Sequence, residues 1–567
     1  AAFAVLERAR SYMESSHHPF EAALAITRAG NLFTTHTPVE AGFDRFAPEL
    51  VEKYLKPYAE EKLHISLQDL LALGRRNQND PHEPLNMAYL ALRGSGAVNG
   101  VSRLHGEVSR RIFQGLFPRW PEAEVPVRHI TNGVHAPTWD SADSDRVWET
   151  TCGKGRWHWT IKDIPGNFAR VSDADLWRMR ASARKSLVEY VRKWLHQQLA
   201  SQGAPVEEVA QAREALDPDA LTLGFARRFA AYKRPGLLLH DPGRLIRILT
   251  NHERPVQLVL AGKAHPQDGA GQDMIQQWIS FVRRPEVRGH AVFLSDYDMV
   301  MAEHFVQGTD VWINTPRRPW EACGTSGMKV LVNGGLNLSE LDGWWAEAYS
   351  PDAGWALGDG KEHGDDPSWD AAEANNLYDL LEREVVPAFY TRDEKGISPG
   401  WAARMRASMA RLTPAFSANR AVREYTEKHY LPAAAAYSAR AANGGKLGAG
   451  LALWEQDLAR HWPGLRFGSV AVDRADGNYT FKVQVYLDGI NPEAVQVELF
   501  ADGQNGSEPV RQPMSRSESP AGPASAFLYI ASVSASRPAT DYTPRVVPCN
   551  AAAFVPLEAP FIFWRDR

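Results

Sequence analysis

The sequence predicts an α/β protein centred on a doubly wound, Rossmann-like parallel sheet, with a small antiparallel β module near its C-terminus. Between about residues 218 and 345, short and almost continuously apolar runs alternate with segments of helical periodicity, as in parallel sheets that are covered on both faces. After residue 465, apolar and polar residues alternate with a period of two, which is typical of antiparallel strands. The length of 567 residues predicts about two to four folding units.

The composition excludes several classes of protein. A hydrophobic fraction of 44% with 23% charged residues is ordinary for a globular protein, so wholesale disorder and collagen-like repeats are excluded. A net charge of -5 argues against a general nucleic-acid binder but leaves room for a local basic pocket. No window approaches the roughly 18–20 apolar residues of a membrane span. The three cysteines, Cys152, Cys323 and Cys549, are far apart, which argues against a disulfide framework or zinc cluster and favours a cytoplasmic setting.

The first 140 residues predict helices with short strands between them. The opening stretch AAFAVLERARSYMES resembles an amphipathic helix and not a signal peptide, so we expect that the chain is processed or that an upstream part is absent. Strands are predicted at 31–38 and 127–134. Helices are predicted at 46–62, at 66–76 behind a Ser66 N-cap, and over 86–117, where a Gly-rich centre interrupts the pattern.

The central region predicts four successive βα units. The strands are expected at 219–226, 256–264, 291–297 and 310–316, and the segments after them are expected to be helical. Ligands of doubly wound sheets bind at the carboxyl ends of the strands, so the loops that follow these runs are the candidate site.

Helices are expected to dominate from 366 to about 460. The tail then predicts antiparallel strands at 481–489, 495–503 and 526–536, separated by Gly, Pro and Ser clusters within 502–525.

The loop after the first central strand is strongly basic. It reads ARRFAAYKRP and holds four cations, Arg227, Arg228, Lys233 and Arg234. Arginine offers a forked set of donors and lysine a point charge, which together suit a phosphate dianion. The alternative is a solvated charged turn, but the position at the end of a central strand favours an anion site.

The loop after the fourth central strand reads WEACGTSGMK, residues 320–329. Its small residues precede a predicted helix, where backbone N–H groups can cradle a phosphate, although the spacing is not that of a P-loop. Lys329 lies one turn into an apolar helix, and a desolvated lysine beside phosphate donors is what an aldehyde cofactor requires for a Schiff base. Cys323 is interpreted as a packing residue, since no histidine neighbours it in sequence.

These motifs resemble those of the α-glucan (glycogen, starch and maltodextrin) phosphorylases. EACGTSGMK is similar to the pyridoxal-phosphate lysine motif of that family and RRFAAYKR to its phosphate-site loop. TTHTPVEAG, VNGVSRLHGEV, HITNGV, GKAHP and FLSDYDMVMAE resemble further family segments in the same order, so the similarity runs from about residue 1 to 360. The tail and GGLNLSELDGWWAEAY resemble the bacterial and archaeal branch.

The resemblance implies a fold of glycosyltransferase-B type, with two Rossmann-like domains, the first incomplete, and the C-terminal β module. Residues 1–140 would be the remnant of the N-terminal Rossmann-like domain and 141–217 a connecting helical region. Residues 218–460 would form the C-terminal Rossmann-like cofactor and phosphate domain with its closing helices, and 461–567 the β module.

The resemblance also implies roles for individual residues. Lys329 would hold pyridoxal phosphate as an imine, with Tyr297 against the cofactor. The phosphate of the cofactor would be held by Thr325, Ser326, Gly327, Arg227 and Lys233. Arg228 and Lys233 would grip the substrate phosphate. Glu321 would hydrogen-bond hydroxyls of the reacting glucose, and Asn132 and His36 would bind its O6 side, with the His36 carbonyl near the forming oxocarbenium ion.

The chemistry that these residues favour is phosphorolysis. Glycoside hydrolysis uses two carboxylates across the bond, whereas only one plausible acid, Glu321, is found here among cations. Phosphate would be the nucleophile, and the 5′-phosphate of the cofactor would be the acid–base group. The implied reaction is reversible and retaining: α-1,4-glucan and orthophosphate give α-glucose 1-phosphate and a shorter chain. It requires Arg228, Lys233 and Lys329 to converge on one crevice.

The sequence departs from the family pattern at several places. Ala230 and Ala231 stand where long members have His-Glu, and Asp298 stands where a basic residue is common, so Arg317 or Arg318 is expected to compensate. His36 comes early, so we expect a large N-terminal part to be missing and the cleft to be open on one side. We also expect this chain to bind pyridoxal phosphate poorly or not at all, and to be much less active than a longer relative.

Two other functions stay open at this point. One is a glucan glycosyltransferase with a nucleotide-sugar donor, which would need no aldehyde cofactor. The other is an inactive, truncated glucan-binding fragment. The β module could serve as an oligomer contact, including one in a homo-oligomer, as a glucan-docking module, or simply in packing.

Overall fold

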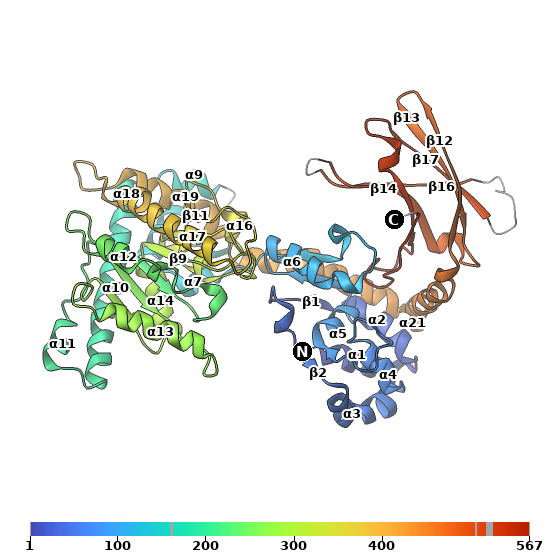
Figure 1. Cartoon of the computed structure of the whole chain (residues 1–567), viewed down its shortest axis with the longest axis horizontal. Helices are drawn as coiled ribbons and strands as arrows, with labels where there is room; N and C mark the ends of the chain where they lie inside the picture. Colours follow the sequence, from blue (N-terminus) through green and yellow to red (C-terminus); the bar gives the residue numbers. More distant parts are fainter. Residues whose placement is uncertain (1, 159–162, 505–506, 518–525, 566–567) are drawn as a thin grey trace.

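The computed structural model describes residues 2–158, 163–504, 507–517 and 526–565. Figure 1 shows two lobes, one built on the central parallel sheet and one that holds the N-terminal helices together with the β module. The described part of the chain contains no helix with the length and apolar character needed to cross a bilayer. The predicted α/β class with parallel sheets is confirmed.

The sheet lobe contains six parallel strands in the order β11-β10-β9-β6-β7-β8, which is the doubly wound Rossmann order. Their bounds are β6 Leu221–Ala226, β7 Val256–Ala261, β8 Ala291–Leu294, β9 Val311–Asn314, β10 Leu336–Glu340 and β11 Gly354–Leu357. The four predicted strands are β6 to β9. β10 and β11 were not predicted, because β10 ends in the polar pair Ser339–Glu340 and β11 lies between Asp and Gly residues that are typical of turns.

Helices cover both faces of this sheet (Figure 1). The principal ones are α8 Ala142–Cys152, α10 Asp173–Ser201, α12 Pro242–Leu249, α13 Gly269–Val282, α14 Met299–Gly308, α17 Pro367–Leu380 and α19 Pro399–Ala415. β6 and β9 are neighbours in the sheet although β7 and β8 lie between them along the chain, so the sheet reverses its winding between them. The crevice at such a reversal is where ligands of doubly wound sheets bind.

The first lobe holds a smaller parallel sheet in the order β1-β4-β5, formed by β1 Leu32–Thr34, β4 Ala97–Gly100 and β5 Val127–His129. Its helices are α1 Phe3–Ser16, α2 Phe20–Thr27, α3 Pro48–Pro57, α4 Leu67–Ala72, α5 Met87–Arg93 and α6 Arg103–Phe113. Ser66 caps α4 as expected, accepting from the Asp69 N–H at 3.1 Å. The Gly-rich centre of 86–117 contains the strand β4, which sequence reasoning missed because it reads AVNG, with Asn99 and Gly100 in place of an apolar run.

The closing helices α20 Ala418–Tyr425 and α21 Leu431–His461 lie against the first lobe, whereas the expected division grouped them with residues 218–460. Arg440 of α21 donates to the Ala25 carbonyl at 2.6 Å, and the Tyr425 hydroxyl accepts from Asn99 at 2.8 Å. The small Gly445 and Gly448 let α21 approach Ile26 of α2 closely, which explains why this helix leaves the sheet lobe.

The β module consists of two four-stranded antiparallel sheets, β12-β13-β17-β16 and β15-β14-β18-β19. The short strands among them are β15 Val510–Pro513, β16 Ser515–Arg516 and β19 Phe563–Trp564. Its main strands are β12 Arg466–Ala475, β13 Asn478–Tyr486, β14 Val495–Ala501, β17 Ala526–Ser534 and β18 Thr543–Pro548. Phe500 and Trp564 share a hydrophobic core with Phe113 and Trp120 of the first lobe, so the module packs on that lobe. Of the predicted Gly, Pro and Ser clusters, residues 505–506 and 518–525 lie outside the described residues.

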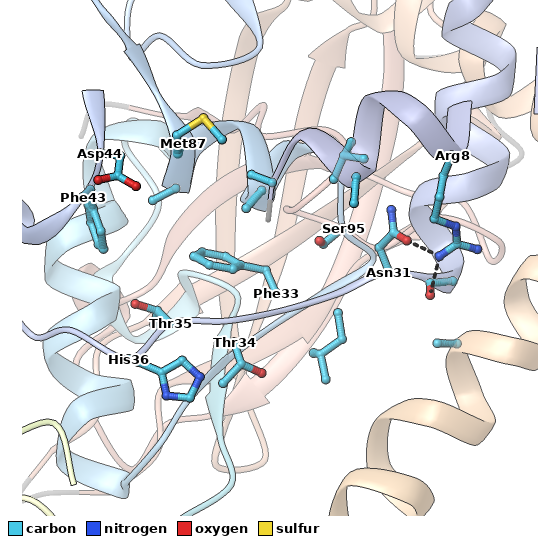
Figure 2. Close-up of a pocket in the computed structure, with 18 of the residues that line it drawn as sticks. Arg8, Asn31, Phe33, Thr34, Thr35, His36, Phe43, Asp44, Met87 and Ser95 are labelled. Atoms are coloured by element: carbon cyan, nitrogen blue, oxygen red, sulfur yellow. Dashed lines mark hydrogen bonds between the residues drawn. The ribbon is translucent and has the colours of Figure 1, made fainter. Parts of the chain in front are cut away.

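β1 is an edge strand, and a hollow of about 1060 Å³ lies beside it. Figure 2 shows Phe33, Thr34 and His36 of the β1 segment facing this hollow, with Phe43 and Met87 on its far side. Residues of α1, α5 and the start of α21 complete the lining. The first lobe is therefore open along this edge of its sheet.

A buried ion group anchors the start of β9. Asp310 is 1% exposed and pairs with Arg184 at 3.0 Å and Arg180 at 3.3 Å, while it also accepts from the Thr222 N–H of β6 at 3.0 Å. The group thereby ties α10 to the two strands that flank the winding reversal.

We expect Asp310→Ala to lower the free energy of unfolding of the sheet lobe by about 3–5 kcal/mol, because it leaves two guanidinium groups buried without a counter-charge. Urea unfolding followed by far-UV circular dichroism measures this, with Asp273→Ala on the exposed face of α13 as the control. Equal midpoints for the two variants would contradict the anchoring role.

Candidate functional site

A cavity of about 530 Å³ lies at the carboxyl ends of β6 and β9 and is lined by both lobes. The first lobe contributes the loops after β1 and β5, and the sheet lobe contributes the basic loop and the loop after β9. Every predicted site residue except Gly327 and Lys329 lines this cavity: His36, Asn132, Arg227, Arg228, Lys233, Tyr297, Glu321, Thr325 and Ser326.

The basic loop is held in place by two anchors. Phe229 is fully buried, and its N–H donates to the Lys263 carbonyl at 2.8 Å. Arg234 adopts a left-handed backbone conformation with φ of 42°, and its guanidinium donates to the Thr315 carbonyl at 3.0 Å. Between the anchors, Arg227, Arg228 and Lys233 are presented to the cavity.

Arg234 is therefore not part of the anion site, although its position in the basic loop suggested that it would be. It is buried and pairs with Glu340, Glu373 and Asp370 behind the site. Burial and the neighbouring carboxylate of Glu373 raise the pKa of Glu340 well above its ordinary value. Arg234 thus balances the negative charge of these three carboxyl groups, and its role is to position the loop that carries Lys233.

The centre of the cavity is a shared ion pair. One oxygen of Glu321, Oε2, accepts from Lys233 Nζ at 2.6 Å and from Arg227 Nη2 at 2.7 Å. Burial lowers the pKa of Lys233 to about 8. Burial acts to raise the pKa of Glu321, but its ion pairs with Lys233 and Arg227 outweigh this, so the pKa is lowered and the carboxylate stays ionised.

This pairing adds to the role expected for Glu321. The resemblance assigned its carboxylate to the hydroxyls of glucose, whereas here the carboxylate contacts the cations that were assigned to phosphate. Sequence spacing could not show this contact, because Arg227 and Glu321 are 94 residues apart.

Arg228 is the exposed cation of the cavity. In the part of the chain that the structure describes, it has no ion pair. It is exposed to solvent and lines the cavity, so it is accessible to an incoming anion.

The loop after β9 turns at Gly324, which has φ of 78°, and then enters the four-residue helix α15, Ser326–Lys329. Thr325 and Ser326 face the cavity. Gly327 lies beneath it, where its carbonyl accepts from Asn337 at 3.0 Å. Gly327 therefore serves close packing of the loop on β10 and not the lining of the cavity.

Lys329 does not reach the cavity in this structure, so the expected convergence with Arg228 and Lys233 holds for those two residues alone. The Lys329 ammonium lies 3.7 Å from the centre of the Trp139 ring, because an aromatic face attracts a cation. Among the described residues it has no ion pair, and burial lowers its pKa. The amine thus remains available for reaction.

Four residues around the cofactor side differ from expectation or refine it. Burial raises the pKa of Tyr297 to about 12, so its hydroxyl stays protonated at the edge of the cavity. Asp298 caps α14 by accepting from the Met301 N–H at 2.8 Å, which gives this acid a structural role. Arg317 pairs with Asp370 at 2.6 Å and Arg318 bonds the Leu341 carbonyl, so neither compensates at the cavity.

Sequence reasoning missed the residues that support the site from behind. Asp342 is 3% exposed and accepts from the Glu321 N–H at 2.9 Å and the Gly343 N–H at 2.7 Å. His105 accepts from the Val101 N–H, so its other ring nitrogen donates to the Thr37 carbonyl at 2.9 Å, beside His36. In the sequence, Asp342 and His105 are marked only by their positions within two segments that resemble the family, ELDGWW and VSRLHGEV.

Contacts between the lobes complete the site. Ser102 donates to the Ala322 carbonyl at 2.7 Å, next to Glu321. Thr131, which precedes Asn132, donates to Glu347 of the sheet lobe at 2.6 Å. The first lobe is thus bonded directly to the loop that carries the shared carboxylate.

The cavity fits a phosphate group, and Lys329 is an amine of the kind that an aldehyde cofactor requires. Its pKa is lowered and, among the described residues, it has no ion pair with a carboxylate, although it lies outside the lining of the cavity. Arg227 is buried, and its Nε and Nη1 have no hydrogen-bond partner in the described residues. Because unsatisfied buried donors are costly, these groups indicate a site for additional acceptor oxygens.

The pH dependence of stability tests the support from Asp342. Burial raises its pKa to about 7 from an ordinary 3.8, so the unfolded chain releases this proton first as the pH rises. Its contribution to the free energy of unfolding therefore falls between about pH 4 and pH 7, by up to about 4 kcal/mol, and is constant above pH 7.

Asp342→Asn is expected to remove this fall, which urea unfolding across that pH range measures. Asp273→Asn, at an exposed carboxylate, should keep the wild-type slope. A slope for Asp342→Asn that matches that of the wild type would rule out the titration.

His105 is expected to hold the loop that carries His36. Burial lowers the pKa of His105, so the ring is neutral and donates from Nε2 to Thr37. His105→Ala should speed hydrogen exchange in residues 35–39 by about tenfold, because one buried hydrogen bond is lost. The control is His82→Ala, at an exposed histidine of the same lobe. Unchanged exchange in His105→Ala would show that the loop is held by other contacts.

Comparison with known proteins agrees with this site. The profile of the carbohydrate phosphorylase family matches residues 1–350. The chain is 39% identical over 509 residues to a glycogen phosphorylase of Mycobacterium bovis, covering 88% of this chain and 58% of the relative. It is 35% identical over 500 residues to a maltodextrin phosphorylase of Thermococcus litoralis, with coverage of 88% and 58%. The chain thus spans 58% of the length of these relatives. By this match and these identities, the chain belongs to the carbohydrate phosphorylase family.

Proposed function

We propose that this chain carries the phosphate and cofactor half of an α-1,4-glucan phosphorylase. The reaction is the reversible, retaining transfer of a terminal glucose from a glucan or maltodextrin to orthophosphate, which gives α-glucose 1-phosphate. The observation that carries this proposal is the convergence of Arg227, Arg228, Lys233 and Glu321 with His36 and Asn132 in one cavity at the winding reversal of the sheet.

The proposal assigns the cations to two anions. Arg228 and Lys233 bind the substrate phosphate from the open side of the cavity. Arg227, whose Nε and Nη1 have no partner among the residues that the structure describes, holds the phosphate of pyridoxal phosphate together with Thr325 and Ser326. When bound through Lys329, the cofactor supplies a phosphate group as the acid–base partner of the substrate phosphate. Oriented donors in a partly buried site stabilise charge as it moves, which is the main catalytic contribution available here.

The sugar is assigned to the interface of the lobes. His36 and Asn132 of the first lobe are placed to bind the O6 side of glucose, and the His36 carbonyl is the group near the forming oxocarbenium ion. Glu321 binds glucose hydroxyls once anions have drawn Arg227 and Lys233 away from it. Phosphate is the nucleophile, which accounts for a cavity that offers one carboxylate among three cations.

We infer a cytoplasmic setting, since the three cysteines are free, with Cys323 buried and Cys549 exposed. The partners are the glucan, orthophosphate and glucose 1-phosphate, without nucleic acid. The β module shares a hydrophobic core with the first lobe, so we assign it a packing role on that lobe. A homo-oligomer would use the faces of the β module that do not pack on the first lobe.

The decisive experiment is to map the cofactor. The chain is incubated with saturating pyridoxal phosphate, reduced with borohydride and digested, and the adduct is located by mass spectrometry. A pyridoxyl adduct at Lys329 is expected, even at low occupancy, because this amine combines a lowered pKa with the absence of a counter-ion among the described residues. Lys329→Ala should abolish it, whereas Lys263→Ala, at an exposed lysine, should not.

Formation of glucose 1-phosphate from maltodextrin and phosphate is measured alongside and is expected to be slower than in longer relatives. No adduct at Lys329 together with transfer from a nucleotide sugar would overturn the proposal in favour of a nucleotide-sugar transferase. Maltodextrin binding with neither adduct nor product would instead indicate a glucan-binding fragment.

A further inference from the structure

The cavity holds an anion of its own. Three cationic side chains line it, Arg227, Arg228 and Lys233, and a carboxylate, that of Glu321, lies among them. One carboxylate oxygen serves both Arg227 and Lys233, at 2.7 and 2.6 Å. The carboxylate therefore occupies the position, between these two cations, at which a bound anion would place an oxygen.

The backbone keeps Glu321 in this position. Its N–H donates to the buried Asp342, and Ala322, the next residue, accepts from Ser102 of the first lobe. The turn at Gly324, with φ of 78°, then folds the chain back beneath the Glu321 side chain. The carboxylate is thus positioned by fixed neighbours, and only side-chain rotation moves it out of the cation pair.

One carboxylate does not satisfy the cations. Arg227 is buried and keeps two unpartnered nitrogen atoms, Nε and Nη1, in the described residues. Arg228 faces the same cavity without an ion pair there. An anion that brings more charge and more acceptor oxygens than a carboxylate would gain these contacts in addition to those that Glu321 makes.

We propose that Glu321 is the resident counter-anion of this site and that it makes the site selective for dianions such as phosphate over monoanions. A monoanion offers no more charge than the carboxylate it would displace, so it gains nothing from the exchange. Phosphate carries up to two charges and enough oxygens to reach Arg227, Arg228 and Lys233 together. This inference rests on the proposed function in so far as phosphate is the substrate, and it names a second role for Glu321 in selecting that substrate.

The test is anion binding by the full chain, without glucan or cofactor. Isothermal titration calorimetry measures the affinity for inorganic phosphate and its competition by chloride. Glu321→Gln should bind phosphate about 10- to 100-fold more tightly, because the competing ion pairs are lost, and chloride should compete more strongly than in the wild type. Lys233→Gln should weaken phosphate binding, which verifies that the titration reads this cavity.

Two further variants separate the effect from net charge and from misfolding. Glu303→Gln removes one negative charge from the exposed face of α14 and should leave phosphate affinity at the wild-type value. Glu321→Asp keeps the charge but shortens the reach to the two cations, so its phosphate affinity should lie between those of the wild type and Glu321→Gln.

Phosphate affinity that is unchanged in Glu321→Gln, or raised equally in Glu303→Gln, overturns the inference. Because the titration uses neither Lys329 nor glucan, it is independent of the cofactor mapping. A tighter Glu321→Gln site, found together with no adduct at Lys329 and with transfer from a nucleotide sugar, would refute the phosphorylase proposal and keep the counter-anion. An adduct at Lys329 with unchanged phosphate affinity in Glu321→Gln would keep the phosphorylase proposal and refute the counter-anion.

Discussion

The shared carboxylate of Glu321 is the interaction on which the site depends. It joins Arg227 and Lys233, in the loop after β6, to the loop after β9, across sequence separations of 94 and 88 residues. A buried cation without a partner is costly, so the two loops are stable in this arrangement only together. The doubly wound strand order makes the pairing feasible, because it places β6 and β9 side by side with their carboxyl ends on one edge.

Behind this contact lies a second layer of buried polar groups that gives the loops their shape. Arg234 holds the end of the basic loop against Glu340 and Glu373, and Asp342 holds the backbone of Glu321. Glu340 ends β10 and Asp342 follows it, and β10 is the strand next to β9, so the sheet itself carries part of this support. These groups fix the backbone of both loops, so an arriving anion changes side-chain contacts and leaves the framework of the loops in place, which favours electrostatic stabilisation.

The first lobe takes part in the site through its strand ends, and its own framework is assembled from distant segments. His36 follows β1 and Asn132 follows β5, and Ser102 and Thr131 bond the lobe to the sheet lobe beside Glu321. The helix α21 and the β module, both from the last third of the chain, pack on this lobe through Arg440 and the core around Trp120. The hollow beside β1 shows that one edge of its sheet is left without a strand partner in the described residues (Figure 2).

The sequence alone determined the features that depend on local pattern. Apolar runs of strand length predicted β6 to β9, the Ser66 cap predicted the start of α4, and the two loops identified most of the side chains that line the cavity, though Lys329 lies outside it. Short strands such as β4 and β11 escaped prediction, since β4 contains Asn99 and Gly100 and β11 begins at Gly354 between turn residues. Only the tertiary structure decided the pairing of Glu321 with Arg227 and Lys233, the placement of Arg234 behind the site, the orientation of Lys329 toward Trp139 and the docking of α21 on α2. Each of these depends on which charge or surface lies nearest in space once the sheet has formed. The separation of two residues along the sequence does not determine the distance between them in the folded chain.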